Sequence, residues 1–346
     1  VPPSIPPVLK TQSIKQYYKS QLYPNLIIID KEHGGGKVDC GNAGINMCTS
    51  PYYLMIDADT VISDQALQAL MRPFLMKRNV LASGGSIGVA NDCELQGNRL
   101  TKINFPKNVI AGIQVVEYLR AFLFGRIGWN DLGGSLIISG AFGLFDRDAV
   151  VKVGGYKLHI AEDIDLTIRL HKKFLYDKKE YIMDFVPDLV AMTEVPTSLS
   201  LLGKQRQRWH RGLLDVIWQN KTMLFNPRYK CVGLLSFPYY TLIEALAPIV
   251  ELVGYIGFVV SLFFGVIHWK FATWFLLLAF GFPFILTYIC VLIQSVTFKW
   301  YFSIGTYLKM FFCSLFEQFG YRQLSVIWRL QGFFQWMFGR ETKWTP

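Results

Sequence analysis

Tyr52-Tyr-Leu-Met-Ile-Asp-Ala-Asp59 is the stretch that decides the fold, because a short apolar run is followed at once by two carboxylates. The run has the length and composition of a buried β-strand, which we predict over residues 52–56. In open α/β sheets, ligands bind beyond the carboxyl ends of the strands, where Asp57 and Asp59 would lie. Two carboxylates there could hold a hard divalent cation that neutralises a diphosphate. Taken alone, such a triplet is more often a solvated turn.

Further strands and helices are expected to alternate around this stretch. We predict strands over residues 23–30, 80–89, 136–145 with a turn at Gly140, and 181–186. We predict helices over residues 39–48, 63–74, 114–124, 146–153, 161–173 and 199–220. Such alternation of strand and helix predicts a parallel α/β sheet.

The composition of the 346-residue chain changes near residue 230. Charged residues make up only 17% of the chain, against about 25% in soluble domains, and the deficit falls after Cys231. Residues 249–267 and 271–296 each hold roughly the 20 apolar residues that a bilayer-spanning helix needs. We therefore predict one domain over residues 1–230 and transmembrane and interfacial helices over residues 231–346.

Two acids within this apolar half, Glu244 and Glu251, need an explanation, because intramembrane carboxylates are costly. They could line a polymer channel, or they could pair within the helix bundle or lie at the interface. The sequence leaves these explanations equally open.

The formal net charge of +10 favours an anionic partner, such as nucleic acid, an anionic membrane face or a phosphorylated substrate. Basic residues gather in residues 204–211 and again in 221–230, directly before the apolar half, as is typical of the cytoplasmic side of a membrane segment. No nucleic-acid-binding motif is present, so we expect no nucleic acid partner. The six cysteines include no CxxC pair, which indicates reduced thiols rather than a disulfide framework or a zinc site.

A glycine-rich loop, Gly34-Gly-Gly-Lys37, precedes the helix expected over residues 39–48. Glycines let a backbone approach a phosphate closely, and Lys37 would supply a counter-charge. The spacing is not that of a P-loop. A flexible turn explains the same residues equally well.

An acidic pair, Glu162-Asp163, begins the helix expected over residues 161–173, with Asp165 as a third acid nearby. Acids in a first helical turn interact favourably with the helix dipole, which is the simplest explanation of a lone pair. Crowded carboxylates also raise one another's pKa values, as a general base requires. Spacing alone does not show which acid would be that base.

Gln205-Arg-Gln-Arg208-Trp209 is the most specific segment of the chain. Arg208 could bind a diphosphate through two parallel hydrogen bonds. Trp209 could present a flat apolar face to a sugar ring. A basic interfacial helix beside a membrane would also explain these residues.

In this order, the motifs at Asp57–Asp59, Glu162–Asp163 and Gln205–Trp209, followed by membrane segments, resemble the processive family-2 glycosyltransferases. These include cellulose, chitin and hyaluronan synthases and the bacterial poly-N-acetylglucosamine synthases. The resemblance covers roughly residues 25–211 and the general layout of the membrane half. Three shorter segments resemble the bacterial enzymes in particular: Gly35–Lys37, Ser139–Gly143 and Tyr321–Gln323.

This resemblance implies a GT-A fold, an α/β nucleotide-sugar-binding domain on the cytosolic membrane face, followed by an α-helical transmembrane and interfacial region. It also implies roles for individual residues. Asp163 would be the general base, Lys37 would contact the nucleotide, and Asp57 and Asp59 would bind the diphosphate and its metal. The remaining roles are a diphosphate contact by Arg208 and acceptor binding by Ser139, Gly140, Ala141, Gln205 and Trp209.

The resemblance also predicts parts that this sequence lacks. The family usually begins with an extra strand ending near Asn-Glu, an Asp-Gly-Ser segment that helps to bind uridine, and a first membrane helix. We therefore expect sequence upstream of Val1. The family's usual Thr before Glu-Asp is Ala161 here, a change that we expect to be tolerated.

The implied activity is inverting transfer of a sugar from a UDP-sugar to a growing β-linked polysaccharide, with Mg2+ or Mn2+ and coupled to passage across the membrane. Single-sugar transfer to a lipid-linked acceptor, and an inactive membrane partner that binds nucleotide-sugar or polymer, stay open as alternatives. Expected partners are a UDP-sugar donor, a glycan or lipid-linked acceptor, the lipid bilayer and an accessory membrane subunit. The expected location is the bacterial inner or plasma membrane, with the catalytic domain in the cytosol.

Overall fold

The computed structural model describes residues 8–32, 35–97, 99–301 and 303–339. Its central sheet has the strand order β3 (Tyr52–Ile56), β8 (Phe142–Asp146), β5 (Val80–Val89), β9 (Ile182–Thr193) and β4 (Thr60–Ile62). Helices of the same half are α1 (Gly36–Met47), α2 (Ala66–Met76), α3 (Val109–Arg120), α4 (Ile127–Asp131), α5 (Arg147–Lys152), α6 (Glu162–Tyr176) and α7 (Leu199–Gln219). A π-helical segment, Ala121–Arg126, joins α3 to α4.

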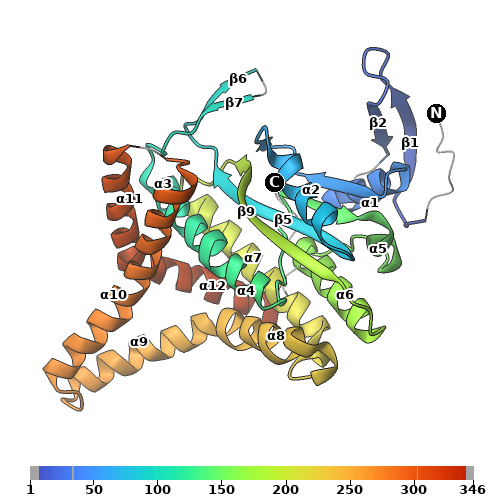
Figure 1. Cartoon of the computed structure of the whole chain (residues 1–346). Helices are drawn as coiled ribbons and strands as arrows, with labels where there is room; N and C mark the ends of the chain where they lie inside the picture. Colours follow the sequence, from blue (N-terminus) through green and yellow to red (C-terminus); the bar gives the residue numbers. More distant parts are fainter. Residues whose placement is uncertain (1–7, 33–34, 98, 302, 340–346) are drawn as a thin grey trace.

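The sheet is mixed, so the prediction of a parallel sheet was wrong. Only β5 and β9 run parallel, whereas β8 is antiparallel to both β3 and β5, and β4 is antiparallel to β9. The order of strands and helices along a chain does not fix the direction in which a strand enters the sheet. Here α3 and α4 carry the chain across the sheet (Figure 1). The strand β8 then enters from the end where β3 finishes, since Phe142 pairs with Ile56.

Three predicted strands differ in the structure. The strand expected over residues 23–30 is β2 (Ile27–Lys31), which pairs only with β1 (Ile14–Lys19) in a peripheral hairpin, so Ile28 is 55% exposed. The strand expected from residue 136 begins only at Phe142. β3 is half-buried rather than buried, because it lies at the edge of the sheet. A second hairpin, β6 (Glu94–Gln96) with β7 (Arg99–Lys102), also projects from the domain (Figure 1).

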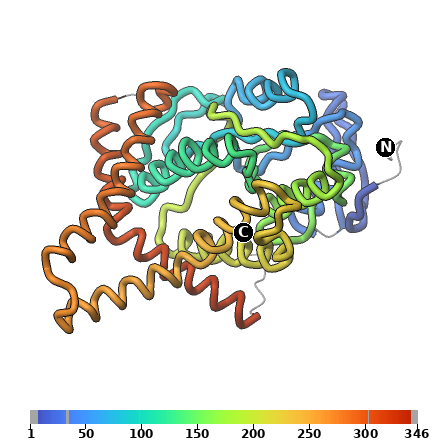
Figure 2. The backbone as a smooth tube through the Cα atoms, turned by 60° about the horizontal axis from the view of Figure 1, so that its bottom comes forward, coloured from blue at the N-terminus to red at the C-terminus, as the bar shows by residue number. Residues whose placement is uncertain are grey.

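The α-helices of the apolar half include α8 (Phe237–Tyr239), α9 (Ala247–Phe263), α10 (Trp269–Ile293), α11 (Ile304–Phe316) and α12 (Arg322–Met337), and π-helical segments join several of them. The helices α9 and α10 form a hairpin that projects away from the rest of the chain (Figure 2). In contrast, α10 and α11 pack against α3, and Leu119 and Val115 share one core with Val291 and Met310. The change in composition near residue 230 is therefore bridged by a common hydrophobic core.

Among the described residues, one helix is long and apolar enough to cross a membrane by itself. It runs from Trp269 to Phe298, and 17% of its most apolar window is buried inside the protein. The helices Val232–Ala245 and Ala247–Phe263 meet this criterion only when counted together, across a bend of 47°. Glu251 and Glu244 pair with Arg322 and Arg329 of α12 at 3.0 and 3.6 Å, so both acids have partners within the helix bundle.

Candidate functional site

The antiparallel pairing of β3 with β8 brings two predicted motifs together. Ile56, the last residue of β3, lies opposite Phe142, the first residue of β8. The backbone N–H of Asp57 therefore donates to the Ala141 carbonyl at 3.1 Å. The chain then turns, with Asp59 exposed, so the Asp57–Asp59 triplet lies beside the segment Ser139–Ala141.

Lys37 lies at the centre of this region. It stands in the first turn of α1, directly after Gly36, whose backbone has a positive φ of 74°. Its Nζ lies 2.5 Å from Asp57 Oδ1 and 3.1 Å from Glu162 Oε1, and it donates to the Gly140 carbonyl at 2.9 Å. Burial alone would lower the pKa of Lys37, but the bonds and charges of Asp57 and Glu162 outweigh it and raise the pKa. Lys37 is therefore a fixed cation; Gly34, before it, lies outside the described residues.

Asp163 faces the same loop from the start of α6. Its Oδ2 accepts from the Gly140 N–H at 3.2 Å, and its Oδ1 accepts from the Ile164 N–H at 2.8 Å. A Cβ placed on Gly140 would lie 3.2 Å from Lys37 Nζ and 3.5 Å from Asp163 Oδ2. A side chain at position 140 would therefore displace the Lys37 ammonium group by a few tenths of an ångström.

Glu162 has a different environment from its neighbour. Burial raises its pKa, and the negative charge of Asp163 adds to this, while Lys37 acts in the opposite direction. Its carboxylate is already engaged by Lys37. Its geometry is therefore that of a residue that holds Lys37 in place.

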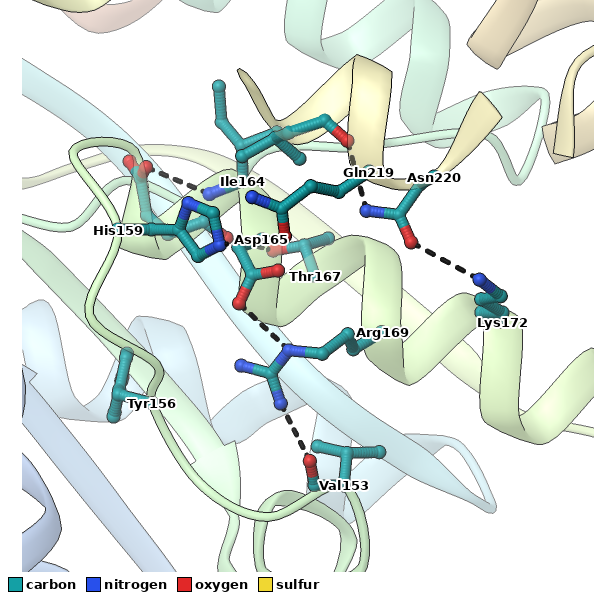
Figure 3. Close-up of polar contacts among 12 residues, drawn as sticks. Val153, Tyr156, His159, Ile164, Asp165, Thr167, Arg169, Lys172, Gln219 and Asn220 are labelled. Carbon is teal, nitrogen blue, oxygen red and sulfur yellow. Dashed lines mark hydrogen bonds and ion pairs between the residues drawn. The ribbon is translucent and has the colours of Figure 1, made fainter. Parts of the chain in front are cut away.

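Asp165, the third acid, points away from the site. It is 2% exposed, and its Oδ2 pairs with Arg169 Nε at 2.8 Å, while Arg169 Nη1 donates to the Val153 carbonyl at 2.7 Å. Figure 3 shows this chain of contacts along α6. The Asp165 carboxylate is therefore part of the fold and unsuited to act as a general base.

Replacing Asp165 by Asn is expected to destabilise the fold by about 3–5 kcal/mol, because it leaves the buried Arg169 charge unpaired. Equilibrium denaturation measures this loss. An Asp165→Asn protein with the same free energy of unfolding as the wild type would contradict the assignment of Asp165 to the fold.

The segment Gln205–Trp209 lies on α7, which packs against the start of α6. A Cβ placed on Gly212 would lie 2.8 Å from Ala161 Cβ, so the two helices approach closely just before Glu162. Arg208 is half-buried and makes no ion pair with any residue that the structure describes. Trp209 is 41% exposed, and the buried Gln205 Oε1 has no hydrogen-bond partner within the described ranges. The structure thus leaves polar groups of this segment available to a ligand.

Two arginines near the site were missed by the sequence reasoning. Arg126, in the π-helical segment, donates to the Ile137 carbonyl at 2.5 Å; burial lowers its pKa, against the opposing charges of Tyr240 and Asp163. The sequence signal for Arg126 was its single charge within the apolar run of residues 121–127. Arg206 lies inside the Gln205–Trp209 segment, where it was treated as a spacer.

The two histidines beside the acidic helix have structural surroundings. His171 is buried, and its Nε2 and Nδ1 lie 2.8 Å from the Ser135 carbonyl and 2.6 Å from the Tyr181 hydroxyl. The His159 side chain is only 9% exposed and lies 3.1 Å from Asp215. It also lies 3.0 Å from Gln219 (Figure 3). These contacts give both histidines a structural role.

Burial lowers the pKa of His171 from 6.5 to about 4, so the folded chain holds it neutral. Its contribution to stability is therefore complete above the unfolded pKa of 6.5 and is lost as the pH falls toward the folded value near 4. We expect His171→Gln to flatten the fall of the melting temperature between about pH 7 and pH 4. The exposed His268, replaced by Gln, is the control; equal slopes in the two variants would contradict the prediction.

Few side chains of the site could act as ligands of a metal ion. Within the described ranges, no group of three or more His, Cys, Asp or Glu side chains could hold a metal ion by itself. Asp57 and Asp59 nevertheless fit a cation such as Mg2+, which proteins commonly bind through one or two carboxylates together with substrate phosphates. Lys37 Nζ, 2.5 Å from Asp57, already places a positive charge there.

Most of the chain matches one known protein family. The family model described as glycosyl transferase family group 2 matches residues 52–313. The poly-beta-1,6-N-acetyl-D-glucosamine synthase of Staphylococcus aureus (strain COL) is 30% identical over 203 residues, which cover 58% of this chain and 44% of that protein. The synthase of the same name from Staphylococcus epidermidis is 31% identical over 192 residues, covering 55% and 41%.

Among solved structures, the mannosyltransferase PcManGT from Pyrobaculum calidifontis, in complex with GDP-Man and Mn2+, is 14% identical with a TM-score of 0.48. That match covers 90% of this chain and 70% of the mannosyltransferase. The chain spans less than half the length of the two curated synthases. The family match begins at β3 and ends in α11, and it includes Asp57, Asp163 and Arg208. The chain therefore belongs to glycosyl transferase family group 2.

Proposed function

We propose that the chain transfers a sugar from a UDP-sugar to a growing β-linked glycan, with inversion at the anomeric carbon. The observation that carries this proposal is the convergence of Lys37 and Asp163 on Gly140, with Asp57 paired to Lys37, since it places a fixed cation and a carboxylate within one small site. The family assignment supports the same reaction.

In the proposed reaction, Asp163 accepts the proton of the acceptor hydroxyl. The acceptor oxygen then bonds to the anomeric carbon while the bond from that carbon to the diphosphate breaks on the opposite face. Both electrons of that bond leave with UDP. Arg208 stabilises the leaving charge through preorganised hydrogen bonds, and Lys37 contacts the nucleotide part of the donor. A divalent ion, Mg2+ or Mn2+, held by Asp57 and Asp59, supplies further positive charge beside the diphosphate when bound.

The acceptor side of the proposal rests on the loop Ser139-Gly140-Ala141 and on Gln205 and Trp209. The loop adjoins Asp163, and Trp209 has an exposed aromatic ring of the kind that packs on sugar rings. The names of the two staphylococcal relatives support N-acetylglucosamine as the sugar.

We also propose that the two parts of the chain have different roles. Residues 1–230 carry out transfer on the cytosolic face, and residues 231–346 anchor the protein in the bacterial inner or plasma membrane and receive the glycan. The exposed apolar surface of α9 and α10 supports contact with lipid.

The test is incubation of the purified full-length protein with radiolabelled UDP-N-acetylglucosamine, followed by sizing of the product. A ladder or long polymer is expected. A single added sugar would limit the activity to one transfer, and no labelled product with any UDP-sugar would refute the proposal.

A further inference from the structure

The helix α3 carries two charged residues one turn apart, Glu117 and Arg120, that reach the membrane half. Glu117 Oε2 accepts from Arg206 Nη2 at 2.7 Å and from the Tyr321 hydroxyl at 2.9 Å. Arg206 Nη2 also donates to the Tyr321 hydroxyl at 3.3 Å. We call this contact among Glu117, Arg206 and Tyr321 the Glu117 clasp. It joins α3, the start of α12, and α7, the helix that carries the segment Gln205–Trp209.

The Glu117 clasp is largely shielded from water. The side chains of Arg206 and Glu117 are 10% and 21% exposed, and Tyr321 is buried. Burial lowers the pKa of Arg206, but Glu117 and Tyr321, together with Tyr118, outweigh it and raise the pKa, so the guanidinium stays charged. The buried Arg206 charge needs the Glu117 carboxylate, because removing either member of the pair leaves the charge of the other uncompensated.

Through Arg206, the Glu117 clasp also contacts Trp209, the aromatic residue of the segment Gln205–Trp209. The Arg206 guanidinium lies 4.7 Å from the centre of the Trp209 ring, the distance of a cation–π contact. Trp209 is itself 41% exposed, so little else holds its ring on the open side. The ring position therefore depends on where the clasp places Arg206.

Arg120 makes the matching contact on the other side of a break in the helices. The chain leaves helical geometry at Phe319 and Gly320, where Gly320 has a positive φ of 95°. Arg120 Nη1 pairs with Glu317 Oε1 at 2.6 Å before the break, whereas Glu117 binds Tyr321 after it. The two charges of α3 therefore fix both sides of this break relative to α3.

We propose that Glu117 and Tyr321 are positioning residues for Trp209, acting through Arg206. This inference rests on the acceptor-binding role proposed for Trp209 and adds the reason for its fixed orientation. The two residues touch neither donor nor metal site, so their loss should weaken acceptor binding while donor binding stays the same. The contact also makes the acceptor site depend on the segment after Gly320.

The experiment compares the full-length wild-type protein with Tyr321→Phe and Glu117→Gln, using β-1,6-linked N-acetylglucosamine oligosaccharides as acceptors. Loss of one hydrogen bond to a charged group predicts a rise of about tenfold in the acceptor KM. The donor KM should remain within about twofold, because neither residue is near Lys37 or Asp57. Arg206→Lys, which keeps the charge but loses the fork of donors, should give an intermediate acceptor KM.

Two matched controls separate positioning from stability. Tyr181→Phe removes the hydroxyl contact with His171, so it should lower the melting temperature without changing the acceptor KM. Glu94→Gln breaks an exposed pair with Lys102 and should change neither. Deuterium exchange over residues 203–212 should rise in Tyr321→Phe and Glu117→Gln alone.

The outcomes are distinct. An unchanged acceptor KM in both clasp variants, or equal rises in donor and acceptor KM, would overturn the positioning role while the proposed transferase activity stands. If the wild-type protein forms no product from any UDP-sugar, the proposed function fails, and the positioning role fails with it.

Discussion

Asp163→Asn is expected to reduce sugar transfer by about 10²–10⁴-fold, the usual contribution of a general base. The amide keeps the size and can still accept the Gly140 N–H, which now lies 3.2 Å from Oδ2. It cannot accept a proton from the acceptor hydroxyl. The measurement is the steady-state rate of UDP release with acceptor present.

The control for this variant is Asp148→Asn, which changes an acid in the first turn of α5 whose side chain is 77% exposed. It should transfer sugar at the wild-type rate. An Asp163→Asn protein that retains more than about a tenth of the rate would rule out Asp163 as the base.

Arg208→Gln is expected to lower kcat by about 10²–10³-fold, as for the loss of one preorganised donor to a developing charge. Arg208 is half-buried and forms no ion pair with the described residues, so its removal leaves no buried carboxylate unpaired. The melting temperature should therefore stay close to that of the wild type, and the loss should appear in transfer alone.

Arg72→Gln is the matched control, since Arg72 is an exposed arginine that pairs with Asp188 at 3.0 Å. The two variants should have similar melting temperatures and very different rates. If Arg208→Gln lost stability but kept its kcat, Arg208 would belong to the fold rather than to the diphosphate site.

Local patterns predicted several elements well. The apolar run before Asp57 is a strand, the run from Val80 is β5, and the acidic start at Glu162 opens α6. These segments have strong periodicity or end signals of their own. The family resemblance, carried by motifs in order, was confirmed by the match over residues 52–313, and the expected fold class, a GT-A α/β domain followed by helices, was confirmed as well.

Strand direction could not be read from the sequence. The antiparallel pairing of Ile56 with Phe142 depends on contacts between distant segments, yet it is this pairing that brings Asp57 to Ala141. The exposed β1–β2 hairpin was missed for a related reason, since Ile27 and Ile28 look like core residues until their neighbours are known.

The sequence indicated which residues would gather at the candidate site, but not which of them contact one another. Asp163 and Asp165 could not be told apart by spacing, whereas the Arg169 contact separates them. Arg206 was read as a spacer because its importance lies in Glu117 and Tyr321, which stand 89 and 115 residues away. The roles of Lys37 and the other site residues stay predictions until they are tested.

The most direct test of the account is a nucleotide-release measurement on the full-length protein, across UDP-sugars with Mg2+ or Mn2+ and an N-acetylglucosamine oligosaccharide. We expect UDP release from at least one UDP-sugar that depends on the acceptor and disappears in Asp163→Asn. Release that persists unchanged in Asp163→Asn, or no release from any UDP-sugar, would contradict the account.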